Sequence, residues 1–307
     1  MAGNSFDLLR PFSTAEALSR GVTRGQLRSA KYRQVMRGYH VATAAAQDPH
    51  ARIRAAVSLH PAGAFASHLS AARLYGLPVP MTSEEHVTVT RDADKRWRTG
   101  VPSHQTSRPV TVTVRHGIAV SAPCDTFVAL GSMLDLVELT AVGDAMVRMR
   151  LATVADLVAA TAASSLKGAP RARKAAGYVR AGVGSPQETR LRMLIVLAGL
   201  PEPAVNYILR DDSGEWIARF DLSYPQYRLI IEYDGRQHAE NPTQWERDLE
   251  RHEMLDNDGW KLVTVTAKGI YSEPERTLDR VTAALRARGR RVSAVRSQAW
   301  RPYFPSR

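Results

Sequence analysis

The sequence predicts an α+β protein of several domains, with an N-terminal winged helix-turn-helix, a mixed α/β middle region and a C-terminal α/β domain on a central mixed sheet. The chain has 307 residues, more than one typical domain needs. Its first 50 residues follow the order helix, turn, helix, strand, and helix and strand patterns alternate again from Ser185. The predicted parts are a winged helix at 1–50, a middle domain at 51–163, a linker at 164–184, the C-terminal domain at 185–288 and a loosely ordered basic tail at 289–307.

The charge of the chain limits its partners. A formal net charge of +12 and an isoelectric point near 10.2 predict attraction to polyanions, most simply DNA or RNA. The alternative is a basic but otherwise ordinary protein.

A single cysteine, Cys124, excludes an internal disulfide and an all-cysteine zinc site. No signal-peptide pattern and no run of about 18 apolar residues is visible, so we expect a soluble, cytoplasmic protein without a membrane partner.

The N-terminal segment has the order of a winged helix. Ser13 is the expected cap of a first helix, Thr14 to Arg20, and Thr23 that of a second helix running through Arg33. Residues 35–41 alternate as a strand of a wing. The second helix and this strand carry the candidate DNA contacts, which are Arg24, Arg28, Lys31, Arg33 and Arg37. The alternative is a solvated basic face on a small three-helix unit.

The middle region offers little chemistry. Helices are predicted at 51–60, 67–75, 125–149 and 153–163, and strands at 86–90 and 110–114. Four histidines lie in it without the spacing of metal ligands, so we expect each to be hydrogen-bonded or exposed: His68, His86, His104 and His116. A stretch rich in Ser, Gly, Pro and basic residues from Ser164 predicts the linker.

The C-terminal pattern predicts a mixed sheet flanked by helices. A helix should begin at Ser185 and end before Gly199. The elements expected after it are strands at 204–209, 216–222 and 229–233, a helix at 243–256, a strand at 260–266 and a helix at 273–288.

Acidic residues interrupt the apolar runs of this domain. The run from Leu229 to Ile231 leads directly into Glu232 and Asp234, and Asp221 ends the preceding strand near the same turn. Buried carboxylates need a partner, and a divalent cation is a suitable one. Magnesium or manganese held by such oxygens can assist hydrolysis of a phosphodiester.

The expected metal ligands are Asp221, Glu232 and the carbonyl oxygen of Tyr233. Asp234 shares a strand face with Glu232, and Glu188 on the preceding helix is a further candidate acid. The alternative is an ion pair of Asp221 with a hairpin arginine, Arg219 or Arg228, which would leave the other acids unexplained.

Residues 185–288 resemble the restriction-endonuclease-like nuclease superfamily with its PD-(D/E)XK core, in particular the branch related to very-short-patch repair endonucleases. The matching features are Glu188, Asp221, the string Glu232-Tyr-Asp-Gly-Arg-Gln-His238, the helix pattern from Trp245 to Arg251 and the strand from Gly259 to Val265. The resemblance implies that Asp221 and Glu232 bind the metal.

One residue departs from that family pattern. The family has a lysine two residues after the glutamate, and this chain has Asp234 there. His238 or Lys261 is the candidate to replace the lysine, and an imidazole suits proton transfer near neutral pH. The alternative for His238 is a hydrogen-bonded histidine at a strand end. Arg236 and Gln237 in the same loop are candidate phosphate contacts.

Four segments of the first 150 residues form a further pattern: Gly21 to Leu27, Val35 to Val41, Ser67 to Leu77 and Ser121 to Thr126. With these segments the region resembles the N-terminal winged-helix domain of AbiEi-type antitoxins from type IV toxin–antitoxin systems. In those antitoxins the domain binds promoter DNA, so the resemblance implies binding to duplex DNA.

These observations favour a metal-dependent DNA endonuclease or nickase that acts in repair, restriction or defence. A second hypothesis is a DNA-binding transcriptional regulator, or a type IV antitoxin-like protein, whose nuclease-like domain is inactive. A third is an RNA nuclease, because phosphates look alike to Lys and Arg. Cleavage of both strands would favour a homodimer. A partner toxin or repair protein would fit the second or first hypothesis, and the sequence identifies neither.

Overall fold

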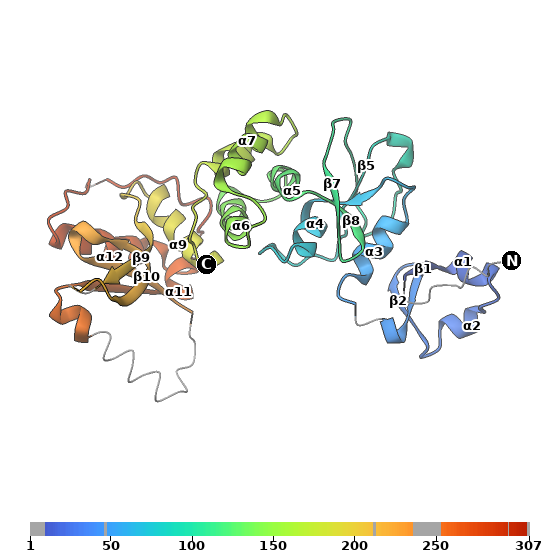
Figure 1. Ribbon diagram of the computed structural model, residues 1–307, viewed down its shortest axis with the longest axis horizontal. Helices are drawn as coiled ribbons and strands as arrows, with labels where there is room; N and C mark the ends of the chain where they lie inside the picture. The colour runs from blue at the N-terminus through green and yellow to red at the C-terminus, as the bar shows by residue number, and fades with distance from the viewer. Residues whose placement is uncertain (1–9, 46–47, 211–212, 236–252, 294, 306–307) are drawn as a thin grey trace. The chain divides into compact units, whose positions relative to one another are not determined.

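The computed structural model describes residues 10–45, 48–210, 213–235, 253–293 and 295–305 (Figure 1). The chain divides into two compact units. The first comprises Met1–Met133 with Ser164–Gly168, and the second comprises Leu134–Ala163 with Ala169–Arg307. Both units mix helices and strands, so the predicted α+β class is confirmed. No helix in the described part of the chain is long and apolar enough to cross a membrane.

The first unit begins with a small three-stranded sheet and two short helices. Its elements are β1 (Phe12–Ser13), α1 (Thr14–Ser19), α2 (Arg24–Leu27), β2 (Tyr32–Met36) and β3 (Tyr39–Ala42), with strand order β1-β3-β2. Both predicted helix caps are confirmed. The Ser13 Oγ accepts from the Glu16 N–H at 3.0 Å, and Thr23 forms a capping box with Gln26.

The second helix is much shorter than the sequence indicates. It ends at Leu27 instead of Arg33, because the following residues pair with β3 as a hairpin. The ring of Tyr32 also packs edge-on against Phe12 at 5.7 Å between centroids. These non-local contacts outweigh local helix propensity. The prediction of one helix bearing four cations is therefore wrong: Arg24 is on α2, Arg28 is its C-cap, Lys31 precedes β2, and Arg33 is in β2.

The rest of the first unit is a five-stranded sheet with helices. Its elements are α3 (Ala51–Ser58), β4 (Phe65–Ala66), α4 (His68–Leu74), β5 (Val87–Val89), β6 (Ser103–Gln105), β7 (Val112–Arg115), β8 (Ile118–Ser121) and α5 (Pro123–Leu130). The strand order is β6-β5-β4-β8-β7. Met36 of the N-terminal hairpin packs on the core of this sheet beside Ala56 and Val101. The hairpin and the middle sheet therefore share apolar contacts.

The second unit contains the C-terminal sheet. Its elements are α6 (Leu136–Arg148), α7 (Val154–Ala163), α8 (Ala169–Ala176), α9 (Pro186–Leu197), β9 (Ala204–Arg210), β10 (Trp216–Tyr224), β11 (Leu229–Asp234), β12 (Lys261–Thr266), α11 (Ala267–Tyr271) and α12 (Pro274–Ala287). The strand order is β12-β11-β10-β9, with only β11 and β12 parallel among these four. The predicted mixed sheet is confirmed.

Two segments differ from simple expectations. Helix α8 lies inside 164–184, where the sequence predicts a linker, and its Ala172 and Ala176 are buried. The basic tail is not loose in its described part, because Trp300 and Phe304 are buried and the Ser297 N–H donates to the Ala198 carbonyl at 3.0 Å. Aromatic side chains amid the arginines anchor the tail to its own unit.

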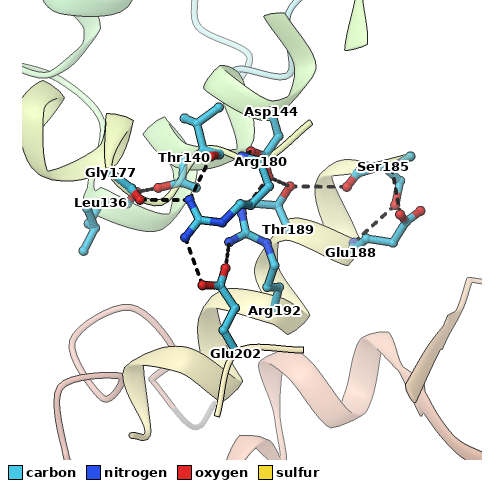
Figure 2. Close-up of polar contacts among 12 residues, drawn as sticks. Leu136, Thr140, Asp144, Gly177, Arg180, Ser185, Glu188, Thr189, Arg192 and Glu202 are labelled. Atoms are coloured by element: carbon cyan, nitrogen blue, oxygen red, sulfur yellow. Dashed lines mark hydrogen bonds and ion pairs between the residues drawn. The ribbon is translucent and has the colours of Figure 1, made fainter. Parts of the chain in front are cut away.

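A buried polar network ties α6 to α9 (Figure 2). Arg192 on α9 is 0% exposed, and its Nη2 donates to Asp144 Oδ2 of α6 at 2.9 Å. The same carboxylate accepts from the Thr189 hydroxyl and the Arg180 backbone N–H. Arg192 Nη1 donates to Glu202 Oε1 at 3.1 Å. The buried charges are thus paired and hydrogen-bonded, which is what burial of ions requires.

Candidate active site

Asp221 and Glu232 come together at one end of the β10–β11 hairpin. Leu222 pairs with Ile231 in this antiparallel ladder, and Asp221 is the next residue outward on β10. The Tyr233 N–H donates to Asp221 Oδ2 at 3.3 Å, so the carboxylate lies against the backbone of β11. Both acids are partly exposed, whereas Ile231 is fully buried. The hairpin therefore holds two carboxylates where a buried strand reaches the surface.

The parallel pairing of β11 with β12 determines which side chains share a face. Glu232 lies beside Thr264 and Asp234 beside Thr266 in a regular ladder. Alternate residues of a strand point to the same face, so Glu232 and Asp234 face the same side, as their spacing suggests. Asp234 therefore occupies the strand position, relative to Glu232, at which the resembled family has its lysine.

Lys261 does not lie with these acids. It pairs with Leu229, three residues before Glu232, which corresponds to roughly 10 Å along the strand. Its register also places it on the face of Leu229 and Tyr233, opposite to that of Glu232 and Asp234. The suggestion that Lys261 replaces the missing lysine is corrected by this geometry.

Glu188 acts locally at the start of α9. Its Oε2 accepts from the Gly184 N–H at 2.8 Å, and its own N–H donates to the Ser185 Oγ at 3.2 Å. A Cβ at Gly184 would lie 3.0 Å from Glu188 Oε1, so a larger residue there would make the Glu188 carboxylate shift by a few tenths of an ångström. These contacts give Glu188 a capping role at the start of the helix, and its role as an assisting acid stays a prediction.

The phenol and the backbone carbonyl of Tyr233 lie in different surroundings. Burial, with the nearby Tyr271 as a smaller cause, raises the pKa of the Tyr233 phenol. The ring thus lies on the side of α11, away from the face of Glu232. Only its backbone carbonyl remains a candidate metal ligand.

The described residues supply only the minimum number of ligands for a divalent cation. Among the residues that the structure describes, no three His, Cys, Asp or Glu side chains are arranged to hold a metal ion. Mg²⁺ in phosphoryl-transfer sites commonly takes one or two carboxylates and completes its shell with water and substrate oxygens. Asp221, which accepts from the Tyr233 N–H, and Glu232 on the neighbouring strand offer that number.

Three predicted site residues, Arg236, Gln237 and His238, lie outside the described residues. Their predicted roles as phosphate contacts and proton carrier stay predictions. The proposed ion pair of Asp221 with Arg228 has a competitor, because the Arg228 guanidinium donates to the Asp258 carbonyl at 2.8 Å.

The N-terminal cations lie exposed on α2 and β2 and in the turns beside them, with Arg37 in the β2–β3 turn and not on a strand as predicted. All five side chains are exposed, and none forms an ion pair with a carboxylate of the described chain. The group consists of Arg24, Arg28, Lys31, Arg33 and Arg37. Unneutralised cations of this density are suited to phosphate contacts.

The structure gathers three histidines that sequence spacing scatters. The rings of His68 and His104 stack with centroids 3.9 Å apart, and His86 Nδ1 lies 3.0 Å from His104 Nε2. Burial lowers the pKa of His68 to about 3 and those of His86 and His104 to about 4, with neighbouring imidazoles or Arg73 adding to the shift. The cluster joins α4 to β5 and β6, and no sequence signal could have found it, since its members are far apart in the chain.

This histidine cluster predicts acid sensitivity of the first unit. Histidines of the unfolded chain have a pKa near 6.5. Between pH 6.5 and about 4 the unfolded chain therefore binds protons that the folded cluster does not bind, so acid favours unfolding. We expect the thermal midpoint to fall as the pH drops from 6.5 to 4. His104→Gln should lower stability at pH 7.5 but show a shallower fall with acid. Parallel pH profiles for the two proteins would contradict this.

Comparison with known families finds a match in the part of the chain that forms this sheet. A model of the restriction-endonuclease-like family REase_MTES_1575 matches residues 214–285, which run from β10 into α12. The C-terminal region is therefore restriction-endonuclease-like, and domains of this class point to a nuclease-type function.

Two relatives extend the similarity beyond that segment. The uncharacterized protein Rv2248 of Mycobacterium tuberculosis (strain ATCC 25618 / H37Rv) is 29% identical over 220 residues, covering 70% of this chain and 79% of the relative. The uncharacterized protein MT2308 of Mycobacterium tuberculosis (strain CDC 1551 / Oshkosh) gives the same values. The aligned length exceeds the family match, so these relatives share more than the nuclease-like segment.

Proposed function

We propose that this protein is a divalent-metal-dependent DNA endonuclease or nickase. The observation that carries the proposal is the pair Asp221 and Glu232, held at one end of the hairpin in a restriction-endonuclease-like region. The net charge of +12 and the exposed N-terminal cations favour a nucleic acid as the substrate. The helix-turn and hairpin order of residues 12–42 favours duplex DNA.

Each residue of the hairpin site would have a separate role in this reaction. Asp221 and Glu232 would hold Mg²⁺ or Mn²⁺, with the Tyr233 carbonyl beside them. When bound, the cation would supply positive charge at the scissile phosphate and a water of lowered pKa. The Tyr233 N–H orients the Asp221 carboxylate. Asp234, on the face of Glu232, would add negative charge to the same site.

Supercoiled plasmid tests the proposal directly. We expect wild-type protein to nick or linearise plasmid with Mg²⁺ or Mn²⁺ and to stop when the metal is chelated. Glu232→Gln should lose cleavage by about 10³-fold, since several kcal/mol of transition-state stabilisation depend on the bound cation. Lys261→Gln is the matched control, because Lys261 lies on the other face, and it should retain cleavage. Cleavage that survives both Glu232→Gln and chelation would overturn the assignment.

A second candidate function is a DNA-binding regulator with an inactive nuclease-like domain. Asp234 at the position of the family lysine favours it, and so does the distance of Lys261 from the acids. Thermal unfolding with and without Mn²⁺ separates the two. A metal that binds the native state raises the midpoint, and this rise should vanish in Glu232→Gln. The regulator function predicts DNA binding with neither cleavage nor a metal-dependent shift.

A further inference from the structure

The turn that joins the β5 region to β6 presents a tryptophan to solvent. Trp97 is 93% exposed, the largest exposure among the large hydrophobic side chains of the described chain. Arg96 and Arg98 flank it in sequence, and both are exposed. A single exposed apolar residue is ordinary on a protein surface, so the significance of Trp97 depends on what surrounds it.

This turn is firmly anchored at its base. The Val101 N–H donates to the Arg98 carbonyl at 3.0 Å, and Val101 itself is buried. The Ser103 hydroxyl donates to the Arg96 carbonyl at 3.0 Å, and the same hydroxyl contacts His60 Nε2 at 2.7 Å. Gly100 adopts a φ of +78°, which suits the tight turn. The fold therefore holds Trp97 outward at a defined position.

Beside Trp97 lies a hollow of about 360 Å³ shared with the N-terminal hairpin. Its walls are Met36, Arg37, Leu59, Trp97, Arg98 and Thr99. Burial raises the pKa of Tyr39, and the charge of Arg98 opposes that rise, which places Arg98 near β3. The hollow thus combines an aromatic plane, two guanidinium groups and a short apolar floor.

Charge in this turn is only partly neutralised. Asp92 pairs with Lys95 at 2.7 Å and Asp94 with Arg91 at 3.7 Å. Arg37 and Arg98 form no ion pair with a carboxylate of the described chain, and Arg37 belongs to the exposed N-terminal cations. The cationic surface of the hairpin therefore continues to Trp97. An aromatic plane beside unpaired arginines matches a nucleobase attached to its phosphates.

We propose that the turn from Lys95 to Thr99 is a second DNA contact, in which Trp97 stacks on an unpaired or extruded base while Arg37 and Arg98 contact the adjoining phosphates. The inference rests on the proposed function in so far as DNA is the ligand. It adds a substrate class, which is DNA with a base out of the stack, such as a bulge or a lesion that weakens pairing.

Binding of labelled DNA without divalent metal tests this contact. The probes are a duplex with a central one-base bulge and the same duplex fully paired. We expect wild type to prefer the bulge, and Trp97→Ala to weaken bulge binding roughly 5- to 150-fold, which is the range of base stacking on one aromatic ring. The paired duplex should change by less than about twofold, and Trp97→Phe should retain most of the preference.

Two further variants make the result specific. Met81→Ala removes another highly exposed apolar side chain, 88% exposed, and should change nothing. Arg98→Ala should weaken both duplexes by a similar factor, since both present phosphates. Equal bulge binding by wild type and Trp97→Ala, or a stronger Trp97-dependent preference for single-stranded RNA of the same sequence, would overturn the proposal. Bulge preference without plasmid cleavage would leave this contact standing and remove only the nuclease function.

Discussion

Asp221→Asn is expected to abolish plasmid cleavage while leaving the fold and the affinity for DNA nearly unchanged. The amide oxygen of asparagine can still accept the Tyr233 N–H bond, so the hairpin keeps its geometry, but the negative charge for a cation is gone. We expect a loss of about 10³-fold or more in the cleavage rate, measured under single-turnover conditions with Mg²⁺ and Mn²⁺.

The matched control for this change is Asp256→Asn. Asp256 is an exposed carboxylate of the same unit, so its replacement alters net charge equally without touching the hairpin acids. It should cleave at the wild-type rate. Retention of full cleavage by Asp221→Asn would exclude the hairpin pair as the catalytic centre. If Asp221→Asn loses cleavage and its thermal midpoint also falls, Asp221 supports the fold. The thermal midpoint of Asp221→Asn would then differ from that of Glu232→Gln.

Removing Arg192 is expected to have the largest effect on stability. Arg192→Ala leaves the Asp144 carboxylate buried without its guanidinium partner, and breaking such a pair costs about 3–5 kcal/mol. Urea denaturation of the full chain should show this as an earlier transition of the second unit. The helices α6 and α9 should separate first, because Asp144 and Arg192 join them (Figure 2).

Two comparisons isolate the cause. Arg276→Ala removes a guanidinium that pairs with Glu273 at the surface. The Arg276 side chain is 73% exposed, so this substitution should lower the free energy of unfolding by less than about 1 kcal/mol. The double variant Arg192→Met with Asp144→Leu removes both charges and should be more stable than Arg192→Ala, since no ion remains buried unpaired. If the double variant is as unstable as the single one, the effect comes from lost packing or from the lost hydrogen bonds of Thr189 and Arg180 to Asp144, and not from the unpaired charge.

The hairpin acids could be found from the sequence because strand periodicity and a short turn are local features. The run ending at Ile231 predicts a buried strand, and a two-residue period places Glu232 and Asp234 on one face. Which residues oppose them depends on β12, whose register no local pattern specifies. That register removes Lys261 from the site, although the sequence presents it as a candidate.

The N-terminal hairpin illustrates the opposite case. The sequence from Arg24 to Arg33 carries helix-compatible residues, and the Thr23 cap is correctly predicted. The helix nevertheless stops at Leu27, because Tyr32 to Met36 gains a strand partner and an aromatic contact with Phe12. Long-range pairing outweighs a propensity of a few tenths of a kcal/mol per residue.

The sequence by itself determined the α+β class, most helix and strand positions, the helix caps and the acids at the β10–β11 hairpin, because each depends on neighbours within a few residues. Only the tertiary structure decided the histidine cluster, the Asp144–Arg192 network and the hollow beside Trp97. The histidines, the ion network and the hollow join residues distant in the chain, and burial, which sets their charge states and contacts, is a property of the packed fold.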